Sequence, residues 1–238
     1  MPKPKTAYLR IIGDVHGKHD KYVHLASQAE YSLQIGDLGF DYSYVDRNLD
    51  YHNHKVIGGN HDNYTKRDGQ FIKQPAHFLK DFGLWSVPGV EPVFYVRGGY
   101  SIDREMRVEG RDWWPDEELT YSRCMEAVDC YLTLRPKLVV AHCCPESIIP
   151  ICPFRRLSGY APIINTRTDA MLEEMYRQHQ PDMWIFGHYH IDWDHTHTRP
   201  ETGHKTRFIC LNELSYKDFP KETEDDKKIV QRVEPDSV

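Results

Sequence analysis

The feature that most constrains this chain is a recurring pattern in which a short apolar run ends at glycine and is followed by side chains that bind metals. Residues 8–12 form the first apolar run, and Gly13-Asp14-Val15-His16-Gly17 follows it. Residues that favour β-structure, closed by a glycine, are typical of a buried strand. Asp14 and His16 would then lie at the carboxyl end of that strand, where open α/β sheets bind their ligands.

The same pattern occurs twice more in the first quarter of the chain. Residues 31–35 lead into Gly36-Asp37, and residues 55–58 lead into Gly59-Asn60-His61-Asp62. Between the first two runs, residues 18–30 carry apolar side chains at helical spacing. Three repeats of a strand and a polar cluster indicate parallel βαβ units that feed one site.

Two later apolar runs end in histidine. Residues 137–141 lead to His142, and residues 183–186 lead to Gly187-His188-Tyr189-His190. An imidazole nitrogen beside a carboxylate oxygen suits a divalent transition metal. The two runs therefore extend the same predicted site.

The middle of the chain has a different sequence pattern. Residues 84–87 and 93–96 are short apolar runs separated by turn residues, which predicts an antiparallel pair in a second sheet. Residues 101–114 form an arginine-rich loop. We predict helices at 115–132, where a proline and three acidic residues mark the start, and at 168–179, where the pattern is amphipathic.

We expect one domain over residues 1–238. A chain of 238 residues with 39% hydrophobic content can fill a single core. The proline-rich stretch 145–165 predicts a long loop and a candidate lid. Charged composition from about residue 217 predicts a C-terminal tail.

Charge and cysteine usage narrow the cellular setting and the partners. The net charge is −6 with both signs mixed, which does not favour nucleic acid as a partner. Six cysteines without Cys-x-x-Cys spacing predict reduced thiols in the cytoplasm. No stretch approaches the roughly 20 apolar residues of a membrane span, so we expect no membrane contact. The sequence leaves the oligomeric state open.

Taken in order, the five clusters resemble the signature blocks of the calcineurin-like metallophosphoesterases. The resemblance covers roughly residues 8–190 and implies an α/β fold, a four-layer αββα sandwich of two mixed β-sheets flanked by helices. It also implies a two-metal site in which Asp37 bridges both ions. One ion would be held by Asp14, His16 and His190, and the other by Asn60, His142 and His188.

The resemblance also implies a reaction. In this family a metal-bound hydroxide attacks the phosphorus of a phosphate mono- or diester. His61 resembles the family's non-ligand histidine, which protonates the leaving oxygen or stabilises the transition state. We expect Asp62 to orient that ring and to favour its charged form. Mn²⁺ is the first choice of metal, with Fe or Zn²⁺ as alternatives, because these ligands do not choose among them.

The chain departs from the protein Ser/Thr phosphatases of this superfamily. Where those enzymes carry Asp-Arg-Gly, this sequence reads Gly39-Phe40-Asp41, and the third block ends in Asp62 instead of glutamate. Small-molecule or nucleotide phosphate esters are therefore favoured as substrates. The arginines that could replace the missing phosphate ligand are Arg104, Arg107 and Arg111, because a guanidinium fork suits phosphate.

Two alternatives stay open. One is a protein phosphatase or nuclease of the same superfamily. The other is a scaffold that kept the fold and a metal but lost catalysis. None of the seven predicted ligand positions is broken, and His61 is present, which a scaffold would not require.

Overall fold

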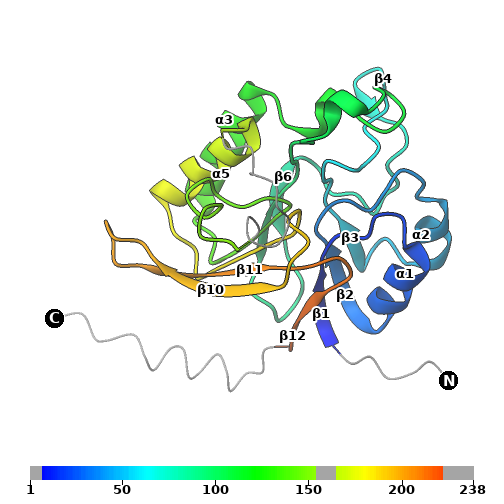
Figure 1. Cartoon of the computed structure of the whole chain (residues 1–238). Coiled ribbons are helices and arrows are strands. Elements are labelled where there is room, and N and C mark those ends of the chain that lie inside the picture. Colours follow the sequence, from blue (N-terminus) through cyan, green and yellow to red (C-terminus); the bar gives the residue numbers. More distant parts are fainter. Residues whose placement is uncertain (1–6, 154–164, 222–238) are drawn as a thin grey trace.

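The computed structural model describes residues 7–153 and 165–221, and two sheets with helices on their outer faces make up most of it (Figure 1). The candidate lid at 145–165 lies mainly outside the described residues. The same holds for the predicted tail from residue 222 onward. Among the described residues, no helix is long and apolar enough to cross a membrane.

The first sheet has four strands in the order β12-β1-β2-β3. Strands β1, β2 and β3 run parallel to one another, and β12 runs antiparallel to β1. Two helices cover its outer face, as the buried cluster of Ile12, Val15, Tyr22 and Val45 shows. The elements are β1 (Ala7–Ile12), α1 (His19–Ser27), β2 (Ala29–Gln34), α2 (Ser43–Asn48), β3 (His54–Val56) and β12 (Tyr216–Phe219).

The second sheet has six strands in the order β10-β11-β9-β8-β7-β6. Its four inner strands are parallel, and both edge strands are antiparallel to their neighbours. Two helices pack on its outer face through a cluster that includes Tyr131, Leu172 and Trp184. The elements are β6 (Phe82–Trp85), β7 (Val93–Val96), α3 (Tyr121–Leu134), β8 (Leu138–Ala141), α5 (Arg167–Gln178), β9 (Met183–Phe186), β10 (Trp193–Thr198) and β11 (Lys205–Cys210).

A third apolar cluster joins the two sheets face to face. Leu9, Ile11 and Leu33 of the first sheet contact a group from the second sheet that includes Val140 and Ile185. With α1 and α2 on one flank and α3 and α5 on the other, the layers run helix, sheet, sheet, helix (Figure 1). Both sheets are mixed, so the predicted αββα sandwich is confirmed.

Four short elements lie outside the two main sheets. Two two-residue strands, β4 (Lys66–Arg67) and β5 (Gln70–Phe71), form a small hairpin. Two 3-10 turns, η1 (Arg104–Met106) and η2 (Pro115–Glu117), lie in the arginine-rich loop and just after it.

The predicted helix at 115–132 begins later than expected. Residues Pro115–Glu117 form the 3-10 turn η2, and α3 begins at Tyr121 after Thr120, whose hydroxyl accepts a hydrogen bond from the Arg123 amide. Glu117 is the physical reason, because its carboxylate is buried and accepts hydrogen bonds from Ser101.

The predicted tail also begins too early. Residues Tyr216–Phe219 form β12, which extends the first sheet along β1. Its sequence is polar, but Arg10 of β1 is buried beneath it and donates to both carboxylate oxygens of Asp218, at 2.7 and 2.9 Å. A charged pair therefore replaces the apolar pattern that would have marked this strand.

Candidate metal centre

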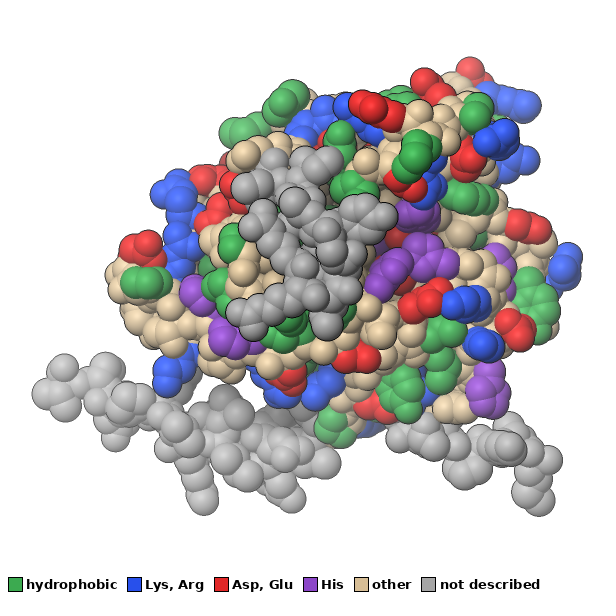
Figure 2. Space-filling view, in the orientation of Figure 1, with side chains coloured by type: hydrophobic (Ala, Val, Ile, Leu, Met, Phe, Trp, Pro, Cys, Tyr) green, Lys and Arg blue, Asp and Glu red, His purple; other side chains and the backbone are tan. Residues whose placement is uncertain are grey.

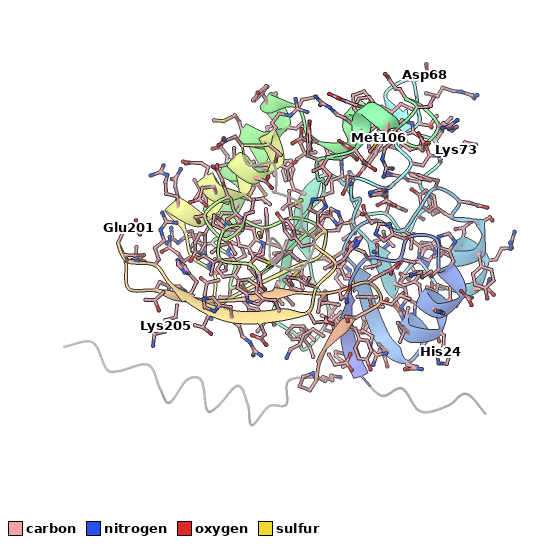
Figure 3. All side chains as sticks on the ribbon, in the orientation of Figure 1. His24, Asp68, Lys73, Met106, Glu201 and Lys205 are labelled. Atoms are coloured by element: carbon pink, nitrogen blue, oxygen red, sulfur yellow. The ribbon has the colours of Figure 1, made fainter. Side chains whose placement is uncertain are left out.

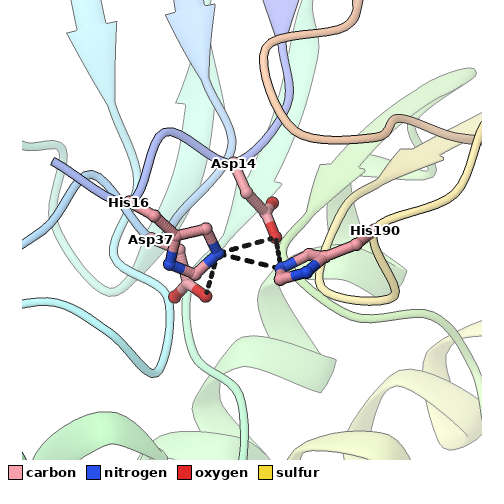
Figure 4. Close-up of side chains that lie close together, drawn as sticks. All are labelled: Asp14, His16, Asp37 and His190. Carbon is pink, nitrogen blue, oxygen red and sulfur yellow. Dashed lines mark hydrogen bonds and ion pairs between the residues drawn. The ribbon is translucent and has the colours of Figure 1, made fainter. Parts of the chain in front are cut away.

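The site lies where the carboxyl ends of the parallel strands meet. Loops after β1, β2 and β9 bring together Asp14, His16, Asp37 and His190 (Figure 4). Each of these side chains offers one ligand atom, and the four atoms all lie within 4.8 Å of one another. Histidine side chains gather near the middle of the face seen in Figure 2. His16 and His190 are partly exposed, whereas Asp14 and Asp37 are buried, so the group is reached from the histidine side.

A second group adjoins the first, and it comes from the loops after β3, β8 and β9. The Asn60 Oδ1 atom lies 2.9 Å from His142 Nε2 and 3.0 Å from His188 Nδ1. Asp37 lies between the two groups. Its Oδ2 atom is 3.7 Å from His16 Nε2, and its Oδ1 atom is 3.3 Å from His142 Nε2. All seven residues predicted as ligands therefore converge in one place.

The backbone at this site is strained. His16, Asp37, His188 and His190 all have φ between +48° and +66°, the left-handed region. They make up half of the eight non-glycine residues with positive φ in the described chain. Each such residue costs about 1–3 kcal/mol and persists only where surrounding structure holds it. Concentration of this strain at one cluster is typical of a functional site.

Two glycines leave room that any side chain would fill. A Cβ atom at Gly187 would lie 2.2 Å from Asp14 Oδ1, and one at Gly59 would lie 2.3 Å from Asp37 Oδ1. Both contacts are far inside van der Waals distance. The glycines before the ligand blocks are therefore required by the close approach of the carboxylates.

The donor atoms suit a cation. His142 Nδ1 lies 2.9 Å from the carbonyl oxygen of Ile35, which only an N–H can satisfy, so the Nε2 atom of the neutral ring carries a lone pair. That lone pair faces the Asn60 oxygen at 2.9 Å. A cation bound here would join these two lone pairs, and a backbone carbonyl behind a ligating histidine is the usual partner in metal sites.

Comparison with known proteins agrees with this geometry. The family model of the calcineurin-like phosphoesterases matches residues 9–192. The chain belongs to this family. It is a metal-dependent phosphoric ester hydrolase.

Two solved structures resemble the phosphoesterase at low identity. A phosphopantetheinyl hydrolase from Mycobacterium tuberculosis is 17% identical, with a TM-score of 0.46, over 97% of this chain and 93% of that one. A predicted phosphoesterase from Streptococcus pneumoniae is 9% identical, with a TM-score of 0.33, over 87% of this chain and 73% of that one. No curated protein matches.

Burial acts alike on the two carboxylates of the phosphoesterase, but their neighbours shift the two pKa values in opposite directions. Burial and the neighbouring Asp14 raise the pKa of Asp37 well above its usual range. Burial opposes the charge of Asp14 as well, but a hydrogen bond with His190 and the surrounding imidazoles lower the pKa of Asp14. A divalent cation between the carboxylates would relieve their repulsion, so the charge distribution also suits a metal.

Asp62 does not make the contact predicted for it. Its carboxylate accepts hydrogen bonds from the backbone amides of Asp37, Leu38, Gly39 and Gly59, and from the Tyr42 hydroxyl, at 2.7–3.3 Å. Among the described residues, no hydrogen bond joins it to the His61 ring. Asp62 therefore fixes the Asp37 loop to the Asn60 loop, and the expectation that it orients His61 is wrong.

Arg107 is the residue that contacts the ring of His61. Its Nη2 atom lies 3.2 Å from His61 Nε2, and Asp103 binds the same guanidinium through both carboxylate oxygens, at 2.7 and 2.8 Å. Burial lowers the pKa of His61 to about 3, and the charge of Arg107 acts in the same direction. The neighbourhood therefore disfavours the charged ring in the free protein, contrary to the prediction.

The other two candidate arginines lie apart from the cluster. The guanidinium of Arg104 stacks 4.8 Å from the centre of the Tyr100 ring, and Arg111 is 68% exposed and pairs with Asp112. Met106, next to Arg107 in the chain, marks the loop that carries all three at the top of Figure 3. The sequence pattern did not predict that Asp103 holds Arg107. The only signal for this ion pair is that the two residues are four positions apart.

Proposed function

We propose that this phosphoesterase hydrolyses phosphate mono- or diesters at a two-metal site, with small molecules or nucleotides as substrates. The observation that carries the proposal is the position of Asp37. One of its carboxylate oxygens faces His16 and the other faces His142, as a ligand shared by two ions would. A shared anion offsets the repulsion of cations held roughly 3.5–4 Å apart.

We assign one ion to Asp14, His16 and His190, and the other to Asn60, His142 and His188, with Asp37 shared between them. Bound divalent cations lower the pKa of water and neutralise phosphoryl oxygens. Mn²⁺ remains our first choice, with Fe or Zn²⁺ as alternatives, because imidazole, carboxylate and amide ligands accept all three.

The residues on the open side supply the rest of the chemistry. We assign Arg107 to a non-bridging oxygen of the phosphate, because its guanidinium is held in place by Asp103 and reaches the ring of His61. An anionic phosphate offsets the charge of Arg107, which raises the pKa of His61 towards its ordinary value. Once Arg107 donates to the phosphate instead of to the ring, His61 Nε2 can hold a proton and deliver it to the leaving oxygen.

The class of substrate is inferred from the net charge of the chain and from its lack of the Asp-Arg-Gly block. The chain has a net charge of −6 and lacks the Asp-Arg-Gly block, which disfavours nucleic acid and phosphoprotein. We further infer that residues 1–238 act as one domain, because the apolar cluster between the sheets takes side chains from both halves of the chain.

Hydrolysis of p-nitrophenyl phosphate and bis-p-nitrophenyl phosphate by the Mn²⁺-loaded protein tests the proposal. We expect turnover that Asp37→Asn reduces to background and that His61→Ala lowers by about 10²–10⁴-fold. His52→Ala is the matched control, because this histidine is exposed and outside the cluster. A metal-loaded protein that hydrolyses neither ester, nor any of a panel of nucleotides and cyclic nucleotides, would overturn the proposed substrates.

A further inference from the structure

The side-chain amide of Asn60 has two ends, and only one of them can bind a cation. Its oxygen lies 2.9 Å from His142 Nε2 and 3.0 Å from His188 Nδ1, on the side of the cluster. Its nitrogen points away and donates to Ser101 Oγ at 3.2 Å. A rotation of 180° about the last bond would exchange the two ends and present N–H groups to the ion. Something must therefore select between these orientations.

Ser101 is held by a buried carboxylate on the side away from the cluster. Its amide donates to Glu117 Oε1 at 2.9 Å, and its hydroxyl donates to Glu117 Oε2 at 2.6 Å. Ser101 has no exposed surface, and Glu117 is 2% exposed. Because the single hydroxyl proton is committed to Glu117, the Ser101 oxygen offers only lone pairs to Asn60.

The carboxylate of Glu117 thus fixes the direction of both hydrogen bonds that link it, through Ser101, to Asn60. A carboxylate accepts only, so the Ser101 hydroxyl must donate to it, and the Asn60 nitrogen must donate to that hydroxyl. The carbonyl oxygen of Asn60 is then left facing the histidines. Every member is buried, so water does not compete for these bonds.

We propose that Glu117 is a positioning residue which, through Ser101, sets the amide of Asn60 so that its oxygen faces the second metal ion. This inference rests on the two-metal site proposed above. Glu117 is the last residue of the turn η2, so this turn carries the carboxylate that meets Ser101. The backbone supports the same arrangement, since the Gly99 amide donates to the Glu117 carbonyl at 3.2 Å.

Glu117→Gln is the sharpest variant, because it keeps the size and removes only the acceptor-only character. In the wild type, the amide and the hydroxyl of Ser101 each donate to one oxygen of Glu117. Glutamine has only one oxygen, so its NH₂ group must face either the amide or the hydroxyl of Ser101. If that NH₂ group faces the hydroxyl, the Ser101 proton turns toward Asn60 and favours the flipped amide. We expect Kd for the second Mn²⁺ to rise at least about tenfold, the usual cost of losing such a supporting contact, while Kd for the first ion stays unchanged.

Glu118→Gln is the matched control. Its carboxylate accepts from the amide and hydroxyl of Thr168, at 2.8 and 3.0 Å, and takes no part in the bonds to Asn60. It should bind both ions as the wild type does. Ser101→Ala removes the hydroxyl by another route and should weaken the second ion in the same way, which keeps the test valid if Glu117→Gln folds poorly.

The decisive measurement is a double-mutant cycle by isothermal titration of Mn²⁺ in the absence of substrate. Aspartate in place of Asn60 has two equivalent oxygens and needs no orientation. Glu117→Gln should therefore weaken the second ion at least about tenfold with Asn60 present, and should have little effect in the Asn60→Asp background.

Three results would overturn the inference. The first is an equal loss in both backgrounds, the second is no loss with Asn60 present, and the third is a matching loss in Glu118→Gln. A wild-type chain that takes up only one ion would overturn the proposed function, and this inference with it. Two ions in the wild type, with an unchanged second affinity in Glu117→Gln, would overturn the inference alone.

Discussion

Single residues in this phosphoesterase act through partners that are distant in sequence. His61 and Asp62 are adjacent, yet the amide of His61 donates to Asp37 at 2.7 Å while the Asp62 carboxylate turns to the backbone of the same loop. The ring of His61 meets Arg107 instead. Residue type and order therefore predicted which side chains gather, because each follows a strand, but not which of them touch.

Arg107 can be separated from its neighbours in a kinetic experiment. Arg107→Ala should lower kcat/KM for a phosphate ester by about 100-fold, the cost of removing one well-placed donor to developing charge. Arg111→Ala is the control, because that side chain is largely exposed and pairs only with its neighbour Asp112 among the described residues. Equal activity of the Arg107→Ala variant and the control would show that Arg107 does not contact the phosphate.

Asp62 should matter for stability as much as for activity. Asparagine at this position turns an NH₂ group towards backbone amides that need an acceptor. We expect Asp62→Asn to lower the free energy of unfolding by about 1–3 kcal/mol, as leaving buried hydrogen-bonding groups without an acceptor does, measured by urea denaturation. Asp41→Asn, on the exposed side of the same loop, is the control. A loss no larger than that of the control would contradict the account.

At the scale of elements, the sequence predicted those strands whose pattern is apolar and missed those that are polar. The apolar runs before the five clusters are β1, β2, β3, β8 and β9, as expected. Two of the edge strands, β10 and β12, are mostly polar and alternate between exposed and partly buried residues, so hydrophobicity did not mark them. Their place in the sheets is set by pairing with a neighbouring strand: β10 pairs with the next strand, β11, and β12 pairs with β1 at the other end of the chain.

The start of α5 carries a testable dependence on pH. Thr166 and Asp169 bond to each other at this helix start, and burial raises the pKa of Asp169 to about 7. Its folded pKa lies above the unfolded value, so the folded state holds the extra proton between about pH 4 and 7 and loses stability as pH rises through that window. Asp169→Asn should therefore gain stability relative to wild type by about 2.6 kcal/mol from pH 5 to pH 8, at roughly 1.4 kcal/mol per pKa unit.

Denaturation of both proteins at several pH values measures this difference. Asp129→Asn on the exposed face of α3 is the control and should follow the wild type. A constant difference between wild type and Asp169→Asn across the range would show that the buried carboxyl does not titrate there.

For the whole molecule, the site and the fold depend on each other. The predicted ligands run from Asp14 to His190, and both sheets contribute loops to the cluster. The two-sheet architecture could be expected from the order of the five clusters, through the family they resemble. The face-to-face contacts between the sheets, and the buried Glu117 beside Ser101, depend on packing that no local pattern encodes.

Metal binding should therefore stabilise the entire chain. An ion that binds only the folded state at 100 times its Kd adds about 2.7 kcal/mol, which raises Tm by roughly 5–10 °C in a chain of this size. Differential scanning fluorimetry with Mn²⁺ and with EDTA measures the shift. Asp37→Asn should lose most of it, and an equal shift in that variant would place the ions elsewhere.

Anomalous diffraction at the manganese edge from Mn²⁺-soaked crystals tests the central claim most directly. We predict two peaks roughly 3.5–4 Å apart, on either side of Asp37. One peak should lie beside Asp14, His16 and His190, and the other beside Asn60, His142 and His188. A single fully occupied peak, or peaks that do not contact Asp37, would contradict the two-metal account.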